Sequence, residues 1–198
     1  MAQKLDTEIR QEQIAQAALA VIARYGLRRL NIAQVARLVG VVPSAVYRHF
    51  ASKDAIVDTV MGLVRERLLE NVRAVTGAVS DPFEQLRLLL KRHVQFIAEN
   101  HALPRVIFSE EVYEGRPGRR RAMFRTIQEY LDRVADIIRK GQTDGRIRTD
   151  VDASTVAVMF LGLIQPAAIL CHMSEGSFDV TGHTDRAWVI FAEAIRAR

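Results

Sequence analysis

Cysteine is almost absent from this chain: Cys171 is the single one among 198 residues, so no intrachain disulfide can form. One cysteine cannot build a cysteine-rich zinc site either. The five histidines show no H-x-x-x-H or comparable metal-ligand spacing. There is no G-x-S-x-G, no phosphate-binding glycine-rich loop and no dinucleotide fingerprint. We therefore expect no enzyme, no metal and no cofactor.

Targeting and membrane signals are also missing. The first residues contain no apolar signal region. The longest apolar run is Val156 to Leu170, and Gln165 and Pro166 interrupt it. A membrane-spanning helix needs about 20 apolar residues, so we interpret this run as a buried helix. These absences, with the scarcity of cysteine, favour a cytoplasmic protein with no membrane partner.

Negative charge is scarce at the N-terminus. Residues 1–53 hold eight of the 28 Lys and Arg residues but only three of the 23 Asp and Glu residues. The remaining residues carry as many basic as acidic side chains, so the whole net charge of +5 lies in the first quarter. A concentrated positive charge is what phosphate neutralisation requires, which points to double-stranded DNA as a partner.

The same quarter contains a helix-turn-helix pattern. Apolar residues from Ile32 to Val39 repeat at helical spacing, and Gly40 supplies the backbone freedom that ends a helix. Pro43 then occupies a position where a new helix can start. Two short helices joined in this way typically place the second one in the DNA major groove.

This segment resembles the DNA-binding domain of the tetracycline-repressor (TetR) family of bacterial transcription regulators. The matching residues are Ile32-Ala33, Val35-Ala36, Gly40-Val41, Tyr47-Arg48-His49-Phe50 and Ser52-Lys53. Val42 stands where the family commonly has Ser, and Ser44 where Gly is frequent. The resemblance implies a DNA-binding head, an effector-binding body and dimerisation through the last two helices.

Several residues are candidates for DNA contact. The resemblance implies phosphate contacts for Tyr47 and Lys53. Asn31 can cap a helix and donate to phosphate, whereas His49 is expected to pack or bond locally. The predicted DNA-binding residues are Asn31, Pro43, Ser44, Ala45, Tyr47, Arg48, His49 and Lys53.

The whole chain is predicted to be all-α, with about nine helices and no strand. The helix-turn-helix domain is assigned to residues 1–53, a connecting helix and linker to 54–79, and the effector and dimerisation domain to 80–198. The expected helices are the two short ones of the helix-turn-helix, the second starting at Pro43, and Thr7–Tyr25, Ser52–Val75, Pro82–Glu99, His101–Tyr113, Arg119–Lys140, Val156–Leu170 and Thr184–Arg196, with a linker at Thr76–Ser80.

Helices of the body could enclose a largely apolar cavity for a small-molecule effector. Its predicted lining is His93, Phe96, Ile97, Phe108, Met123, Ile127, Tyr130, Met159, Phe160, Leu163 and Gln165. The predicted homodimer interface is Ala168, His172, Trp188, Phe191, Ala194 and Ile195. The basic run from Arg116 to Arg125 is interpreted as a solvated loop and first helical turn, with an anionic-ligand site as the alternative.

The function predicted is a dimeric repressor that a small, mainly apolar effector releases from its operator. Two alternatives stay open: an activator or protein-sensing regulator of the same fold, and a non-specific DNA-binding architectural protein. Nothing in the sequence identifies the effector, the operator or the regulated genes.

Overall fold

The computed structural model describes residues 2–100, 107, 110–114, 116–174 and 176–198. These residues form helices, and an isolated bridge between Ile147 and Arg196 is their one extended pairing. The all-α prediction is thereby confirmed. The chain divides into two compact units, Met1–Glu66 with Asn100–Met123, and Arg67–Glu99 with Phe124–Arg198. The predicted functional division at residues 53 and 79 stays a prediction.

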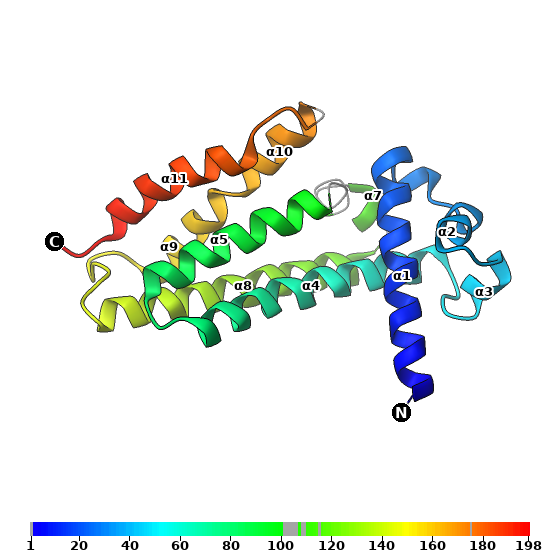
Figure 1. The fold of residues 1–198 in the computed structure, drawn as a ribbon, viewed down its shortest axis with the longest axis horizontal. Coiled ribbons are helices and arrows are strands. Elements are labelled where there is room, and N and C mark those ends of the chain that lie inside the picture. The colour runs from blue at the N-terminus through cyan, green and yellow to red at the C-terminus, as the bar shows by residue number, and fades with distance from the viewer. Residues whose placement is uncertain (1, 101–106, 108–109, 115, 175) are drawn as a thin grey trace. The chain divides into compact units, whose positions relative to one another are not determined.

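The first unit contains the helix-turn-helix (Figure 1). Its elements are α1 (Ala2–Tyr25), the 3₁₀ turn η1 (Leu27–Arg29), α2 (Ile32–Val39), α3 (Pro43–Tyr47), the start of α4 (Lys53–Ala78), α7 (Glu110–Tyr113) and the start of α8 (Pro117–Thr143). Helix α2 packs against both α1 and α3. The buried core includes Ile14, Val21 and Ile22 of α1, with Val35 and Val46 from the two short helices.

Local chemistry sets the ends of these short helices. The Asn31 side chain accepts hydrogen bonds from the backbone N–H groups of Ala33 and Gln34, at 2.7 and 3.4 Å. Gly40 ends α2 in the left-handed conformation at φ 75°, which glycine adopts without steric cost. Pro43 begins α3, where its missing N–H costs nothing. The pattern predicted from the sequence is confirmed here residue by residue.

The second unit holds the rest of α4 and α8 together with α5 (Pro82–Glu99), α9 (Ala153–Gly162), α10 (Gln165–Met173) and α11 (Val180–Ile195). Helix α11 packs against α5 and α10. Asp81 and Asp152 cap α5 and α9 by accepting from the backbone N–H groups of Glu84 and Thr155. Phe160 and Phe191 meet in the core with ring centroids 5.9 Å apart.

The predicted start of the linker is wrong, whereas the helix expected before α8 lies partly outside the described residues. The expected linker Thr76–Ser80 is shorter, because α4 continues to Ala78 and the Thr76 hydroxyl bonds back to the Val72 carbonyl. Part of the expected helix His101–Tyr113 lies outside the described residues, and Glu110–Tyr113 is helical.

The single helix expected over Val156–Leu170 is instead two, α9 and α10. The backbone N–H groups of Leu163 and Ile164 bond three residues back, to Phe160 and Leu161, so the helix tightens and ends. Pro166 cannot supply the N–H that would continue it. Among the described residues, Ala153–Met173 is long and apolar enough to cross a membrane by length and composition alone, with 39% of it buried in the protein.

Candidate nucleic-acid interface and effector domain

Four of the eight predicted DNA-binding residues lie in α3, and Arg48 follows it directly. Pro43, Ser44, Tyr47 and Arg48 are exposed, and the Tyr47 side chain is exposed over 57% of its surface. Ala45 is half-buried, while Val46 turns fully inward. A phenol and a guanidinium that reach solvent from one short helix are able to donate hydrogen bonds to phosphate or base edges.

Three other predicted DNA-binding residues, Asn31, Lys53 and His49, are partly buried or make hydrogen bonds within the protein. The Asn31 oxygen is used in capping α2, which leaves its amide group as the donor for a phosphate oxygen. Lys53 is half-buried, and its ammonium group donates to the Arg28 carbonyl at 3.4 Å. His49 is also half-buried, and within the described part of the chain its Nδ1 is a buried atom with no hydrogen-bond partner. Whether these residues contact DNA stays a prediction.

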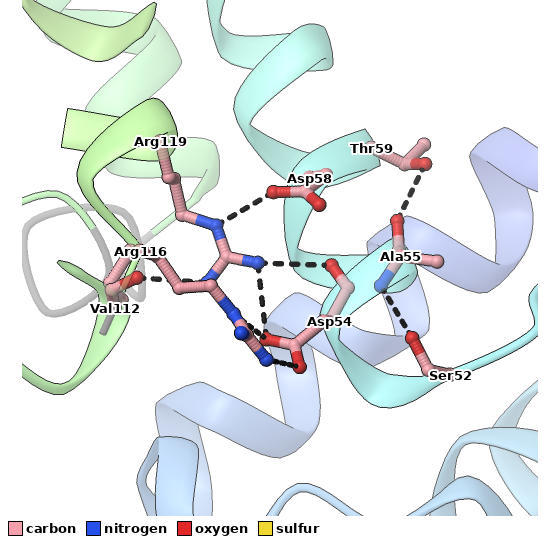
Figure 2. A network of polar contacts seen from close by, with 8 residues as sticks. All are labelled: Ser52, Asp54, Ala55, Asp58, Thr59, Val112, Arg116 and Arg119. Carbon is pink, nitrogen blue, oxygen red and sulfur yellow. Dashed lines mark hydrogen bonds and ion pairs between the residues drawn. The ribbon is translucent and has the colours of Figure 1, made fainter. Parts of the chain in front are cut away.

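Four charged side chains form a cluster beside this head (Figure 2). Asp54 and Asp58 lie in the first two turns of α4. Arg119 lies in the first turn of α8, and Arg116 directly precedes that helix. The Arg116 guanidinium holds the pKa of Asp54 below its usual value, mainly through their hydrogen bond. We refer to these four residues as the arginine cluster.

The arginine cluster corrects the prediction for the basic run. A solvated loop was expected, yet the Arg119 side chain is only 6% exposed and both arginines are bound to carboxylates. The partners lie more than 60 residues apart in the sequence, so local patterning carries no signal for the pairing. Arg120 does lie at the surface, where it pairs with Glu110 at 3.2 Å.

The predicted effector residues are only partly brought together. His93, Tyr130 and Phe160 are buried in the second unit. His93 Nδ1 lies 3.1 Å from the Tyr130 hydroxyl oxygen, and the two rings meet edge to face. Burial lowers the pKa of His93 to about 4 and raises that of Tyr130. This neutral polar pair sits inside an otherwise apolar core.

The other predicted effector residues are more scattered. Phe96, Ile97, Ile127, Leu163 and Gln165 are half-buried. Met159 is exposed, Met123 belongs to the other compact unit, and Phe108 lies outside the described residues.

A cavity of about 400 Å³ opens elsewhere in the second unit, and its lining mixes apolar with polar and charged side chains. None of the predicted effector residues borders it. It is lined by Leu69, Val72, Arg73, Thr76, Gln85, Glu129, Arg133, Asp136, Ile137 and Lys140. The apolar side chains expected to surround a cavity instead fill the core themselves.

The predicted dimer residues also need correction. Ala168, Phe191 and Ile195 are buried within the subunit's own core, so they have little surface left for a partner. Trp188 is half-buried, and His172 and Ala194 are exposed. The exposed apolar side chains of these helices lie at other positions, and we call them the apolar face: Val158, Met159, Ile169, Leu170, Met173, Val189 and Ile190.

Comparison with known proteins decides the family. The profile described as bacterial regulatory proteins of the tetR family matches residues 14–60, and the one described as the tetracyclin repressor-like C-terminal domain matches residues 79–168. The chain belongs to the TetR family. The first match covers the helix-turn-helix and the second covers most of the body. Members of this family are transcriptional regulators, not enzymes.

Individual relatives of this TetR-family chain are distant but match along its length. It is 24% identical over 193 residues to the nucleoid occlusion factor SlmA of Vibrio atlanticus, covering 94% of this chain and 96% of that protein. The structure of the fatty acid degradation regulator FadR from Bacillus halodurans superposes with a TM-score of 0.79 at 20% identity, covering 95% and 97% of the two chains. FadR from Bacillus subtilis, solved in complex with stearoyl-CoA, gives a TM-score of 0.74 at 22% identity over 93% and 98%.

These matches make the chain a TetR-family regulator with a helix-turn-helix DNA-binding domain and a tetracyclin repressor-like C-terminal domain. At this level of identity the solved structures establish the fold alone.

Proposed function

We propose that this TetR-family regulator is a cytoplasmic, dimeric repressor that reads an operator through α3 and leaves it when a small, mainly apolar effector binds. The observation that carries the proposal is the charge and surface of the helix-turn-helix head. It concentrates the positive charge of the chain and exposes Tyr47 and Arg48 on a helix-turn-helix. Phosphate contacts position such a head, and base contacts specify the sequence.

Dimerisation follows from the same proposal. Two heads on a two-fold axis read half-sites about one DNA turn apart, roughly 34–36 Å. The apolar face supplies exposed apolar side chains on α9, α10 and α11 for contact with the second copy, since such contact removes them from water. The expected test is sedimentation: Ile190→Asp gives monomers, whereas Phe124→Asp, at another exposed apolar position on α8, leaves the dimer intact.

An effector with a long acyl chain is supported by the relatives. One of the matching structures is a fatty acid degradation regulator, and another holds stearoyl-CoA. The second unit contributes the His93–Tyr130 pair as a polar group within an apolar interior, which is the composition that suits an apolar ligand with one polar end.

The decisive experiment is a selection from random duplexes, followed by binding measurements with and without stearoyl-CoA. A repressor prefers its enriched duplex over random DNA by about 10³ or more. Stearoyl-CoA then weakens binding roughly 5- to 150-fold, the usual range of coupling between two sites. Tyr47→Phe weakens duplex binding roughly tenfold because it removes one hydrogen bond, while Tyr25→Phe, on α1, leaves it unchanged.

A second candidate is a regulator that senses a protein or acts along the chromosome, as the name of the SlmA relative suggests for that protein. The filled core around Phe160 favours it, because a protein partner needs no internal cavity. Under this alternative stearoyl-CoA leaves duplex binding unchanged. An architectural protein would instead bind all sequences within about tenfold of one another.

A further inference from the structure

Arg119 donates hydrogen bonds to three residues at once, two on α4 and one on α7. Its Nε donates to the Asp58 carboxylate at 2.6 Å, and its Nη2 donates to both the carbonyl and the carboxylate oxygen of Asp54, at 3.3 and 3.2 Å. Its Nη1 donates to the carbonyl of Val112 in α7, at 2.8 Å (Figure 2). Every nitrogen of the guanidinium is therefore engaged, and two of the acceptors are backbone carbonyls whose positions are fixed.

The burial of Arg119 separates it from an ordinary surface ion pair. Pairs between exposed side chains contribute little, because water screens them and long side chains lose entropy. Here the arginine side chain is 6% exposed, although its carboxylate partners remain in contact with water. Removing the arginine would leave two carboxylates and two carbonyls without their shared donor. A lysine could replace the charge but not the fork of five N–H donors.

Arg116 reinforces the same turn of α4. Its Nη2 lies 2.5 Å from Asp54 Oδ2, and its Nε donates to the other carboxylate oxygen at 3.4 Å. Helix α7, which supplies the Val112 carbonyl, also packs against η1 of the head. Helix α7 thus contacts η1, while Arg116 and Arg119 bind the first two turns of α4.

These turns lie directly after the DNA-binding residues. Asp54 follows Lys53, the predicted phosphate contact, and α4 starts six residues after the last residue of α3. The Ser52 hydroxyl caps α4 by accepting from the N–H of Ala55 at 3.2 Å. With so short a connection, the direction of the first turns of α4 constrains where Tyr47 and Lys53 can reach along the DNA backbone.

We propose that Arg119 is a positioning residue for DNA binding. It fastens the segment Glu110–Tyr113 and the start of α8 to the first two turns of α4, and so orients α3 and Lys53 for phosphate contact without touching DNA. The inference rests on the proposed function, since it assumes that α3 binds a duplex. The proposal assigns a role in DNA binding to a residue that is not itself predicted to contact DNA.

The test compares Arg119→Met with Arg121→Met, which removes the same charge from an exposed position in the same run. Both are measured on the enriched duplex, across a salt series. Arg119→Met is expected to weaken binding at least tenfold, and its slope of log Kd against log salt should fall by about 0.9 for each phosphate that the head no longer neutralises. Arg121→Met should stay within about twofold of the wild type, with an unchanged slope.

The salt slope distinguishes positioning from a general loss of folded protein. A smaller active fraction lowers apparent affinity but leaves the slope unchanged, and circular dichroism and sedimentation report that fraction directly. Arg119→Lys is expected to bind the duplex at least fivefold more weakly than the wild type, because the lysine ammonium group cannot bind all the acceptors. If Arg119→Lys equals the wild type, or if Arg119→Met keeps its affinity and slope, positioning by Arg119 is refuted.

Two further results keep the outcomes separate. If Arg119→Met does not fold, Asp58→Asn is measured in its place, because it removes one partner of Arg119. Asp58→Asn should weaken duplex binding by a smaller factor, and an unchanged affinity would count against the proposal. If the wild-type protein enriches no duplex, the proposed function fails. Amide hydrogen exchange across α3 and the start of α4 then tests positioning alone, since Arg119→Met should accelerate it and Arg121→Met should not.

Discussion

Acidification should destabilise the second unit through His93. Its imidazole is buried against the Tyr130 hydroxyl, and burial lowers its pKa from 6.5 to about 4. In the folded protein His93 therefore stays neutral down to about pH 4, whereas in the unfolded chain it is protonated below about pH 6.5. Stability from the neutral ring is complete above that pH and is lost progressively as the pH falls towards 4. The slope is at most about 1.4 kcal/mol per pH unit, which gives a loss of roughly 2 kcal/mol between pH 7 and pH 5.

The assay is urea unfolding at fixed protein concentration and several pH values. The transition is monitored by the fluorescence of Trp188 and by circular dichroism. Fixed concentration matters because subunit association contributes to the stability of a dimer. His93→Gln cannot titrate but can still hydrogen-bond to Tyr130. Its free energy of unfolding should fall by about 2 kcal/mol less than that of the wild type between pH 7 and pH 5.

His172→Gln is the matched control, since His172 is exposed on α10. Its pH profile should parallel that of the wild type. Parallel profiles for His93→Gln and the wild type would refute the reasoning, because they would mean that burial does not keep His93 neutral in the folded state.

Three other substitutions test the local structure by urea unfolding. Asn31→Ala should cost about 1 kcal/mol by removing the cap of α2, whereas Asn31→Ser keeps it; equal stabilities would contradict the capping role. Gly40→Ala should cost about 1–2 kcal/mol, because the residue sits at φ 75° where a Cβ is strained although space is open; a neutral result would mean the turn can relax. Phe160→Ala should cost about 3–5 kcal/mol by opening a cavity between α9 and α11, and a loss below 1 kcal/mol would show that the core collapses around it.

The helix-turn-helix was predictable because its determinants are local. A cap, a glycine turn and a proline start lie within a dozen residues, from Asn31 to Pro43, and each acts on backbone groups a few positions away. The same holds for the caps of α5 and α9, where the Asp81 and Asp152 side chains accept from backbone N–H groups three residues further along. Elements specified by neighbouring residues need no knowledge of the tertiary fold.

The arginine cluster was not predictable in this way. In sequence, Arg119 is one of several arginines in a polar stretch, and such stretches are usually solvated. Its burial depends on Asp54 and Asp58, which the fold brings to it from 61 to 65 residues away. The adjacent Arg120 and Arg121 have the same chemistry and stay at the surface. The composition of the run therefore could not show which arginine becomes buried.

The C-terminal helices show a related limit. The stripe containing Phe191 and Ile195 was identified correctly as apolar, but it was assigned to a partner subunit and instead lies in the subunit's own core. Val189 and Ile190 form a second apolar face on the same helix, and they are exposed. Periodicity finds apolar faces, yet it cannot say which one a helix turns inward when both are apolar.

Specific DNA binding places a demand on the head that α3 cannot meet alone. The helix has five residues, and its exposed polar side chains are few. Each mismatched base pair costs about 1–3 kcal/mol, while a preference of 10³ requires about 4 kcal/mol. Two heads can supply this only if each one meets its half-site in the same register. A fixed direction for α4 is then part of specificity, and the bonds of Arg119 to Asp54 and Asp58 are the contacts in the described head best placed to fix it.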